Sequence, residues 1–86
     1  MYYVYALLSL SVKNWLYIGY SDDLKTRVAT HNNKKVKSTK SKTPLKLIYY
    51  EAYVDEMDAR RRERELKTHQ QKDILKEKLK KSLLRH

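Results

Sequence analysis

The segment LYIGYSDDLKTRVATH, residues Leu16–His31, decides how this chain folds. Its first residues are rich in aromatic and branched side chains, which predicts a strand that ends in a tight turn at Gly19. Gly19 is the only glycine of the chain, so we expect either positive φ or a close approach that a Cβ would block. A helix then opens at Ser21, with Asp22 and Asp23 beside its positive end.

The helix after this turn carries two candidate functional residues. Leu24 and Val28 lie four residues apart, which places them on one face toward a core. Arg27 and His31 flank the same stripe, since successive helical residues turn by about 100°. We therefore expect a guanidinium and an imidazole at the rim of the core, where they can converge on an anionic group.

Composition and charge bound the class of protein. The chain has 86 residues, a net charge of +10 and no cysteine, so we expect one domain over residues 1–86 without disulfides or a thiolate metal site. It has no apolar run of membrane-spanning length and no signal-peptide pattern, which predicts a cytoplasmic location. The charge indicates a polyanionic partner, with nucleic acid first and an anionic membrane surface or acidic protein second, although small proteins also use charge for solubility alone.

The pattern along the whole chain predicts an α+β fold with the order β-β-α-β-α-α. Strands are expected over residues 2–8, 15–20 and 45–54, and helices from Ser21, over 55–69 and over 71–84. The first strand is apolar on both faces, so it should be the central strand of a small three-stranded sheet, antiparallel or mixed. A leucine stripe in the last helix indicates that this helix packs on the sheet.

Residues 32–43 form a predicted loop with five lysines and no acidic residue. Such an acid-free loop can grip the phosphate backbone of a nucleic acid with little regard for sequence. The candidate nucleic-acid-binding residues are Lys34, Lys35, Lys37, Lys40 and Lys42.

Glu63 interrupts an otherwise apolar face of the helix predicted over 55–69. A buried carboxylate must be paired or must bind a metal, because an isolated buried charge is too costly. Spacing alone favours an ion pair with a nearby arginine (Arg60, Arg62 or Arg64) over a metal site.

The chain has eight tyrosines and no phenylalanine. If the first two strands pair, the hydroxyls of Tyr5 and Tyr17 lie near Arg27. A phenol titrates near ~10, so it acts as a general base only beside a cation or a metal. Taken singly, each tyrosine fits core packing better than catalysis.

Several short pieces of the chain occur in the same order in one protein family. They are Tyr3-Val4-Tyr5, Tyr17-Ile18-Gly19, Arg27, His31, Thr43-Pro44 and Ala59-x-x-Arg62-Glu63-x-x-Leu66-Lys67. Together they resemble the GIY-YIG nuclease superfamily. The likeness is strongest to its small stand-alone bacterial members, which are related to the N-terminal nuclease domain of the bacterial excinuclease.

This resemblance implies a metal-dependent endonuclease that hydrolyses DNA phosphodiester bonds by a tyrosine-assisted, single-metal mechanism. Tyr5 would help to deprotonate the attacking water, and Tyr17 would position water or phosphate. Arg27 would stabilise charge on the phosphoryl oxygens, and His31 would assist proton transfer. Glu63 would hold one Mg²⁺ or Mn²⁺ ion.

The resemblance also implies the surroundings of the protein. DNA is the expected partner, in DNA repair and in association with the nucleoid, without a membrane or a small-molecule cofactor. The expected oligomeric state is a monomer or a weak homodimer.

Two departures from the family pattern keep an alternative open. Tyr3 stands where the first half-motif has glycine, and no asparagine follows Asn33, whereas many members carry one in the C-terminal helices. The alternative is a non-catalytic nucleic-acid-binding module that retains the nuclease fold. A basic adaptor for an acidic protein is a third hypothesis.

Overall fold

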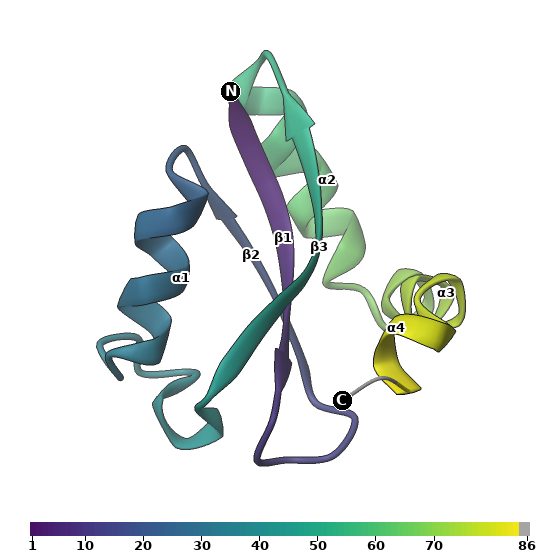
Figure 1. Cartoon of the computed structure of the whole chain (residues 1–86). Helices are drawn as coiled ribbons and strands as arrows, with labels where there is room; N and C mark the ends of the chain where they lie inside the picture. Colours follow the sequence, from purple (N-terminus) through teal and green to yellow (C-terminus); the bar gives the residue numbers. More distant parts are fainter. Residues whose placement is uncertain (85–86) are drawn as a thin grey trace.

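The computed structural model describes residues 1–84 and confirms the predicted α+β class (Figure 1). The strands are β1 (Tyr2–Ser9), β2 (Leu16–Ser21) and β3 (Leu45–Tyr53). The helices are α1 (Leu24–Asn32), α2 (Glu56–Leu66), α3 (His69–Lys78) and α4 (Lys80–Leu84), and a short 3-10 turn, η1, covers Lys40–Lys42. Within residues 1–84, no helix combines the length and the apolar character that crossing a membrane requires.

The three strands form one antiparallel sheet with the order β2-β1-β3. The predicted central position of the first strand is therefore correct, and every residue of β1 from Val4 to Ser9 is buried. Figure 1 shows α1 on one side of the sheet and α2, α3 and α4 on the other. The two faces of β1 are therefore covered by different helices.

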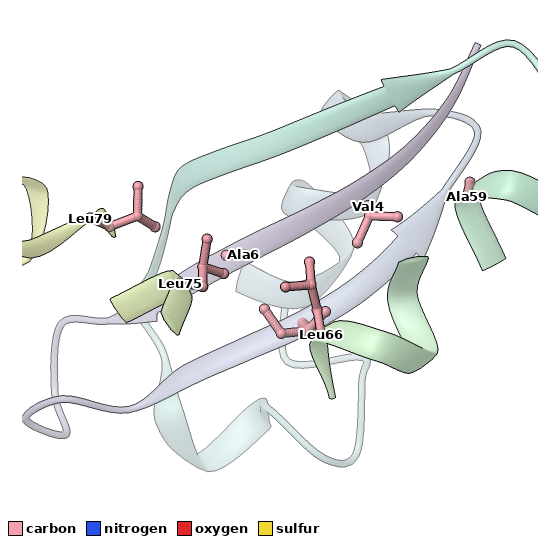
Figure 2. Close-up of a cluster of buried hydrophobic side chains, with 7 residues drawn as sticks. Val4, Ala6, Ala59, Leu66, Leu75 and Leu79 are labelled. Carbon is pink, nitrogen blue, oxygen red and sulfur yellow. The ribbon is translucent and has the colours of Figure 1, made fainter. Parts of the chain in front are cut away.

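Alternate residues of β1 pack into two separate clusters, because successive side chains of a strand point to opposite faces. Val4 belongs to the larger cluster, which Leu66 of α2 and Leu75 of α3 help to form (Figure 2). Tyr5 and Leu7 belong to the smaller cluster on the other face. Helix α1 covers the smaller cluster with the predicted apolar pair, Leu24 and Val28.

Gly19 lies inside β2, opposite Tyr5 of β1, and not in a turn. No glycine among the described residues has positive φ, so the expectation of positive φ at Gly19 is wrong. The alternative, a close approach that excludes a Cβ, is correct, since a Cβ on Gly19 would lie 2.3 Å from Tyr5 Oη. Because Gly19 has no side chain, the Tyr5 ring can lie directly over β2.

Helix α1 begins later than predicted, because β2 continues through Ser21, which pairs with Tyr3. The N-cap is Asp23, whose carboxylate accepts a hydrogen bond from the Thr26 amide at 3.1 Å. Ser21 instead accepts from the Asp23 amide at 3.0 Å, which bends the chain before the helix. The acidic residues therefore precede the first turn and do not lie within it.

The C-terminal helices also differ from the prediction. Helix α2 has the predicted N-cap, Asp55, but ends at Leu66, because Thr68 adopts extended backbone angles and caps α3 with its side chain. The last predicted helix is divided at Leu79, which is the C-cap of α3. The leucine stripe still packs as expected, with Leu75 and Leu79 both buried in the larger cluster.

Candidate active site

The hydroxyl of Tyr5 is the centre of a buried polar cluster on the α1 face of the sheet. Arg27 Nε donates a hydrogen bond to Tyr5 Oη at 3.3 Å, and His31 Nε2 lies 2.8 Å from the same oxygen. Both partners come from α1, with Arg27 in its first half and His31 in its last turn, and α1 also carries the apolar pair that packs on Tyr5. The expected convergence of the guanidinium and the imidazole is therefore present, and a phenol lies between them.

His31 is completely buried, so its two ring nitrogens depend on protein partners. Nδ1 lies 2.8 Å from Thr39 Oγ1, and Nε2 contacts Tyr5 as described above. The ring also packs edge-on against Tyr17, with the ring centroids 5.0 Å apart. Burial lowers the pKa of His31 from 6.5 to about 4, and the charge of Arg27 contributes to the same shift. The imidazole is therefore neutral at pH 7 and offers one unprotonated nitrogen.

The charge state of the phenol depends on the same contacts. Burial raises the pKa of Tyr5, and the hydrogen bond from Arg27 only partly opposes this effect. The pKa of Arg27 is raised, chiefly by its hydrogen bond to Tyr5 and with a smaller contribution from Tyr17. At neutral pH the site therefore holds a protonated phenol, a cationic guanidinium and a neutral imidazole.

Glu63 approaches this cluster from α2. Its carboxylate pairs with Lys67 at 3.2 Å, and Lys67 Nζ lies 5.8 Å from the centroid of the Tyr17 ring. The negative charge of Glu63 also makes a small contribution to the raised pKa of Tyr5, after burial as the main cause. Tyr5, Tyr17, Arg27 and His31 therefore form one cluster of contacts. Glu63 lies next to this cluster through Lys67, which contacts Tyr17.

Two of the three arginines expected beside Glu63 bind other carboxylates. Arg60 pairs with Glu56 at 2.9 Å, and Arg62 pairs with Glu51 of β3 at 2.9 Å. Arg62 and Arg64 lie one position from Glu63 and do not face it, and Arg60, three positions away, pairs with Glu56 at the i,i+4 spacing. Lys67 follows Glu63 by four residues and forms the ion pair that was expected from an arginine.

Arg62 and Glu51 form part of a second polar cluster that fixes α2 on β3. Arg62 donates to both oxygens of the carboxylate, and Tyr49 and Tyr53 donate to it at 2.6 and 2.5 Å. Charge-assisted hydrogen bonds of this kind are stronger than neutral ones. They hold the helix turn from which Glu63, the next residue, projects.

Glu63 is a lone candidate ligand for a metal ion. Among residues 1–84, no group of three or more histidine, aspartate or glutamate side chains gathers in a way that could hold one. A hard cation such as Mg²⁺ keeps several waters and needs only one or two carboxylates beside substrate oxygens, so one half-buried carboxylate fits it. Lys67 would have to release Glu63 when such an ion binds.

The lysine-rich loop is tied to the site at several points. Asn32 is the last residue of α1, and its side-chain amide accepts from the Leu45 amide at 2.7 Å and donates to the Leu45 carbonyl at 2.9 Å. The Ser9 hydroxyl donates to the Lys42 carbonyl at 2.6 Å. Of the five lysines, four are exposed and Lys42 is half-buried, with Nζ 5.8 Å from the Trp15 ring centroid. The loop therefore displays ammonium groups from a backbone that is fixed beside the sheet.

The sequence interpretation missed Thr39 and gave no role to Lys67. Thr39 lies in a run of polar residues, and no periodicity in such a run indicates burial. Lys67 carried a usable signal, since it follows Glu63 by four residues.

Comparison with known proteins identifies the family of this chain. Residues 1–80 match the family model of the GIY-YIG catalytic domain. A UPF0213 protein of Staphylococcus epidermidis is 44% identical over 62 residues, which cover 71% of this chain and 76% of the relative. A UPF0213 protein of Staphylococcus haemolyticus is 42% identical over 64 residues, which cover 73% of this chain and 78% of the relative. No solved structure matches the chain significantly. The chain therefore belongs to the GIY-YIG family.

Proposed function

We propose that this protein is an endonuclease that hydrolyses DNA phosphodiester bonds with the help of one divalent metal ion. Membership in the GIY-YIG family supports a nuclease. The observation that carries the proposal is the Tyr5 hydroxyl, which lies between the guanidinium of Arg27 and the imidazole of His31. A fixed cation and a neutral base around one hydroxyl are the groups that an attack of water on a phosphate diester requires.

In the proposed reaction, Tyr5 accepts one proton and passes on another. The Tyr5 oxygen takes a proton from the attacking water, while its own proton moves to Nε2 of His31. The new P–O bond forms as the bond to the leaving oxygen breaks, and the leaving oxygen takes a proton from solvent. His31 then returns its proton to Tyr5 as Tyr5 releases the proton of the water to solvent, so that one water and one diester give a phosphomonoester and an alcohol.

The exposure of the side chains supports the remaining roles in this proposal. Tyr5 and His31 are buried, whereas Arg27 and Tyr17 are each partly exposed. In the proposal, Arg27 binds the phosphoryl oxygens and Tyr17 orients the phosphate or the water. Glu63 would hold Mg²⁺ or Mn²⁺, which supplies Lewis-acid stabilisation of the phosphate and its leaving oxygen.

We further propose that the lysine loop binds the DNA backbone. The net charge of +10 favours a polyanion, and each phosphate contact contributes a slope of about −0.9 to the dependence of log K on log salt. Replacing Lys34, Lys35 and Lys37 with Gln should therefore reduce the salt dependence of binding without changing sequence preference. Such a protein would act in DNA repair in the cytoplasm, in association with the nucleoid, as the resemblance to the excinuclease domain implies.

A plasmid-nicking assay in Mg²⁺, Mn²⁺ or EDTA tests the proposal. We expect metal-dependent nicking that Glu63→Gln and Tyr5→Phe both abolish. Glu65→Gln is the matched control, because Glu65 lies on the same helix and is exposed. Nicking that persists in Glu63→Gln would refute the metal role, and a wild-type protein that fails to nick in either metal would refute the proposed enzyme.

A non-catalytic nucleic-acid-binding module is the second candidate, and one observation favours it. Lys67 already neutralises Glu63 at 3.2 Å, as in a carboxylate with a structural role. The same assay separates the two, since a binding module shifts labelled DNA in a gel without nicking it in any metal. In that case Glu63→Gln should lower stability and leave DNA affinity unchanged.

A further inference from the structure

We propose that Thr39 is a positioning residue that fixes the tautomer of His31, with the proton on Nδ1 and the lone pair of Nε2 facing Tyr5. This inference rests on the proposed nuclease function for its consequence in catalysis. The claim about the His31 tautomer itself involves only residues of this protein and no substrate. It can therefore be tested whether or not the protein cleaves DNA.

The position of Thr39 is defined by burial and by its backbone. The residue is completely buried, although it lies in a run of polar residues. Its amide donates to the Val36 carbonyl at 3.1 Å, and its carbonyl accepts from the Lys42 amide at 2.9 Å. The side chain therefore enters the core from a closed turn, with Oγ1 2.8 Å from His31 Nδ1.

The two ends of this series of hydrogen bonds determine in which direction each bond is donated. Arg27 Nε can only donate, and the Val36 carbonyl, 3.4 Å from Thr39 Oγ1, can only accept. Tyr5, His31 and Thr39 lie between these ends, and each donates one proton and accepts one. The arrangement that satisfies all of them runs from Arg27 to Tyr5, from Tyr5 to Nε2, from Nδ1 to Thr39, and from Thr39 to the carbonyl.

The opposite tautomer, with the proton on Nε2, leaves one hydrogen bond of this series unmade. If Thr39 donated to Nδ1, then Nε2–H would point at the Tyr5 oxygen, which already accepts from Arg27. The Tyr5 proton would then lack an acceptor among the contacts of this hydroxyl in residues 1–84. A buried polar group without its partner is destabilising, and this cost favours the first tautomer.

The tautomer decides what the site can do. With the proton on Nδ1, Nε2 can receive the proton of Tyr5 when Tyr5 takes one from water. With the proton on Nε2, the same pair of residues cannot pass a proton inward. Thr39 touches neither substrate nor the reacting atoms, so its loss should reduce turnover and leave DNA binding intact.

The experiment compares Thr39→Val, which removes the hydroxyl at nearly constant shape, with Thr39→Ser, which retains it. The first measurement is the ¹⁵N NMR spectrum of His31, in which protonated and unprotonated ring nitrogens resonate far apart. We expect protonated Nδ1 in wild type and Thr39→Ser, and loss of this state in Thr39→Val. Thr30→Val is the control, because the Thr30 hydroxyl donates to the Thr26 carbonyl at 2.9 Å in its own helix.

The second measurement is nicking, with kcat and KM determined separately. Thr39→Val should lower kcat by roughly 10–100-fold, as is typical when the outer partner of a functional histidine is removed, and KM should not change. Thr39→Ser should restore kcat. A wild-type His31 with the proton on Nε2 would overturn the inference even if Thr39→Val failed to fold. A wild type that never nicks would refute the proposed function, while the NMR result would still decide the role of Thr39.

Discussion

Gly19→Ala tests whether the only glycine of the chain exists to make room for Tyr5. A Cβ at this position would lie 2.3 Å from Tyr5 Oη and 2.4 Å from Cζ, whereas ordinary contact begins at 3.4 Å. The ring of Tyr5 is buried and cannot swing into solvent. The phenol must therefore move by about 1 Å, which is enough to break its hydrogen bonds and to cost roughly 100-fold in a rate that depends on its placement.

The effect on stability combines two opposing terms. Overpacking in a core costs about 1–3 kcal/mol. The φ of Gly19 is not positive, so alanine suits the strand backbone and recovers about 0.4–1 kcal/mol through the unfolded chain. We therefore expect Gly19→Ala to lower the free energy of unfolding by about 1–2 kcal/mol.

A double-mutant cycle with Tyr5→Leu isolates the cause, because leucine is shorter than the tyrosine that the Cβ meets. In that background only the contact of the new Cβ with Tyr17 Cε2 at 2.9 Å remains, so the penalty of Gly19→Ala should be much smaller than in wild type. Urea unfolding followed by the fluorescence of Trp15, the only tryptophan in the chain, measures both free energies. An equal penalty in the two backgrounds would refute the reasoning and would place the constraint in the backbone.

Three further predictions concern the polar clusters. Glu51→Gln should lower the free energy of unfolding by about 2–4 kcal/mol in urea melts, because it removes the charge that an arginine and two phenols share, and a loss below about 0.5 kcal/mol would contradict this. Burial alone would raise the pKa of Glu51, but its hydrogen bonds outweigh burial and lower the pKa. Stability should therefore decline as pH falls below 4.5, the ordinary value, in pH-dependent melts, and the decline should be weaker in Glu51→Gln. The pKa values of Tyr49 and Tyr53 are raised from 10.0 to about 12, so stability should also decline as pH rises through this interval. Arg27→Gln should raise the pKa of His31 above about 4 in an NMR titration, since the charge of Arg27 is the second cause of the low value after burial, and an unchanged pKa would show that burial acts alone.

The sequence contained enough information to predict the sheet and most of the site. Apolar residues on both faces of the first strand predicted its central position, and helical spacing placed Arg27 and His31 beside the stripe of α1 that meets the core, where they contact Tyr5. Such predictions succeed because one element of regular geometry relates all the residues involved. Gly19 shows the limit, since composition left positive φ and an excluded Cβ as alternatives, and only the register of β1 against β2 shows that Tyr5 occupies the space of a Cβ.

The unpredicted contacts join elements that no local period relates. Thr39 reaches His31 because a turn in the lysine loop closes beside α1. Arg62 is adjacent to Glu63 in sequence, yet it binds Glu51 on β3, because consecutive helical residues project in different directions. Polar residues in loops give no periodic signal of burial, so their partners depend on the tertiary structure.

Burial of the Tyr5–His31 pair has a consequence for the proposed reaction. An exposed histidine with a pKa near 6.5 is partly protonated at neutral pH, whereas His31, with a pKa of about 4, stays neutral and keeps a free lone pair. The charge of Arg27 is one cause of this low pKa. A phosphate bound to Arg27 would offset that charge and raise the pKa of His31, so the substrate itself would strengthen the base that receives the proton of Tyr5. The site would then gain basicity only when a phosphate is in place, which couples proton transfer to occupancy by the substrate.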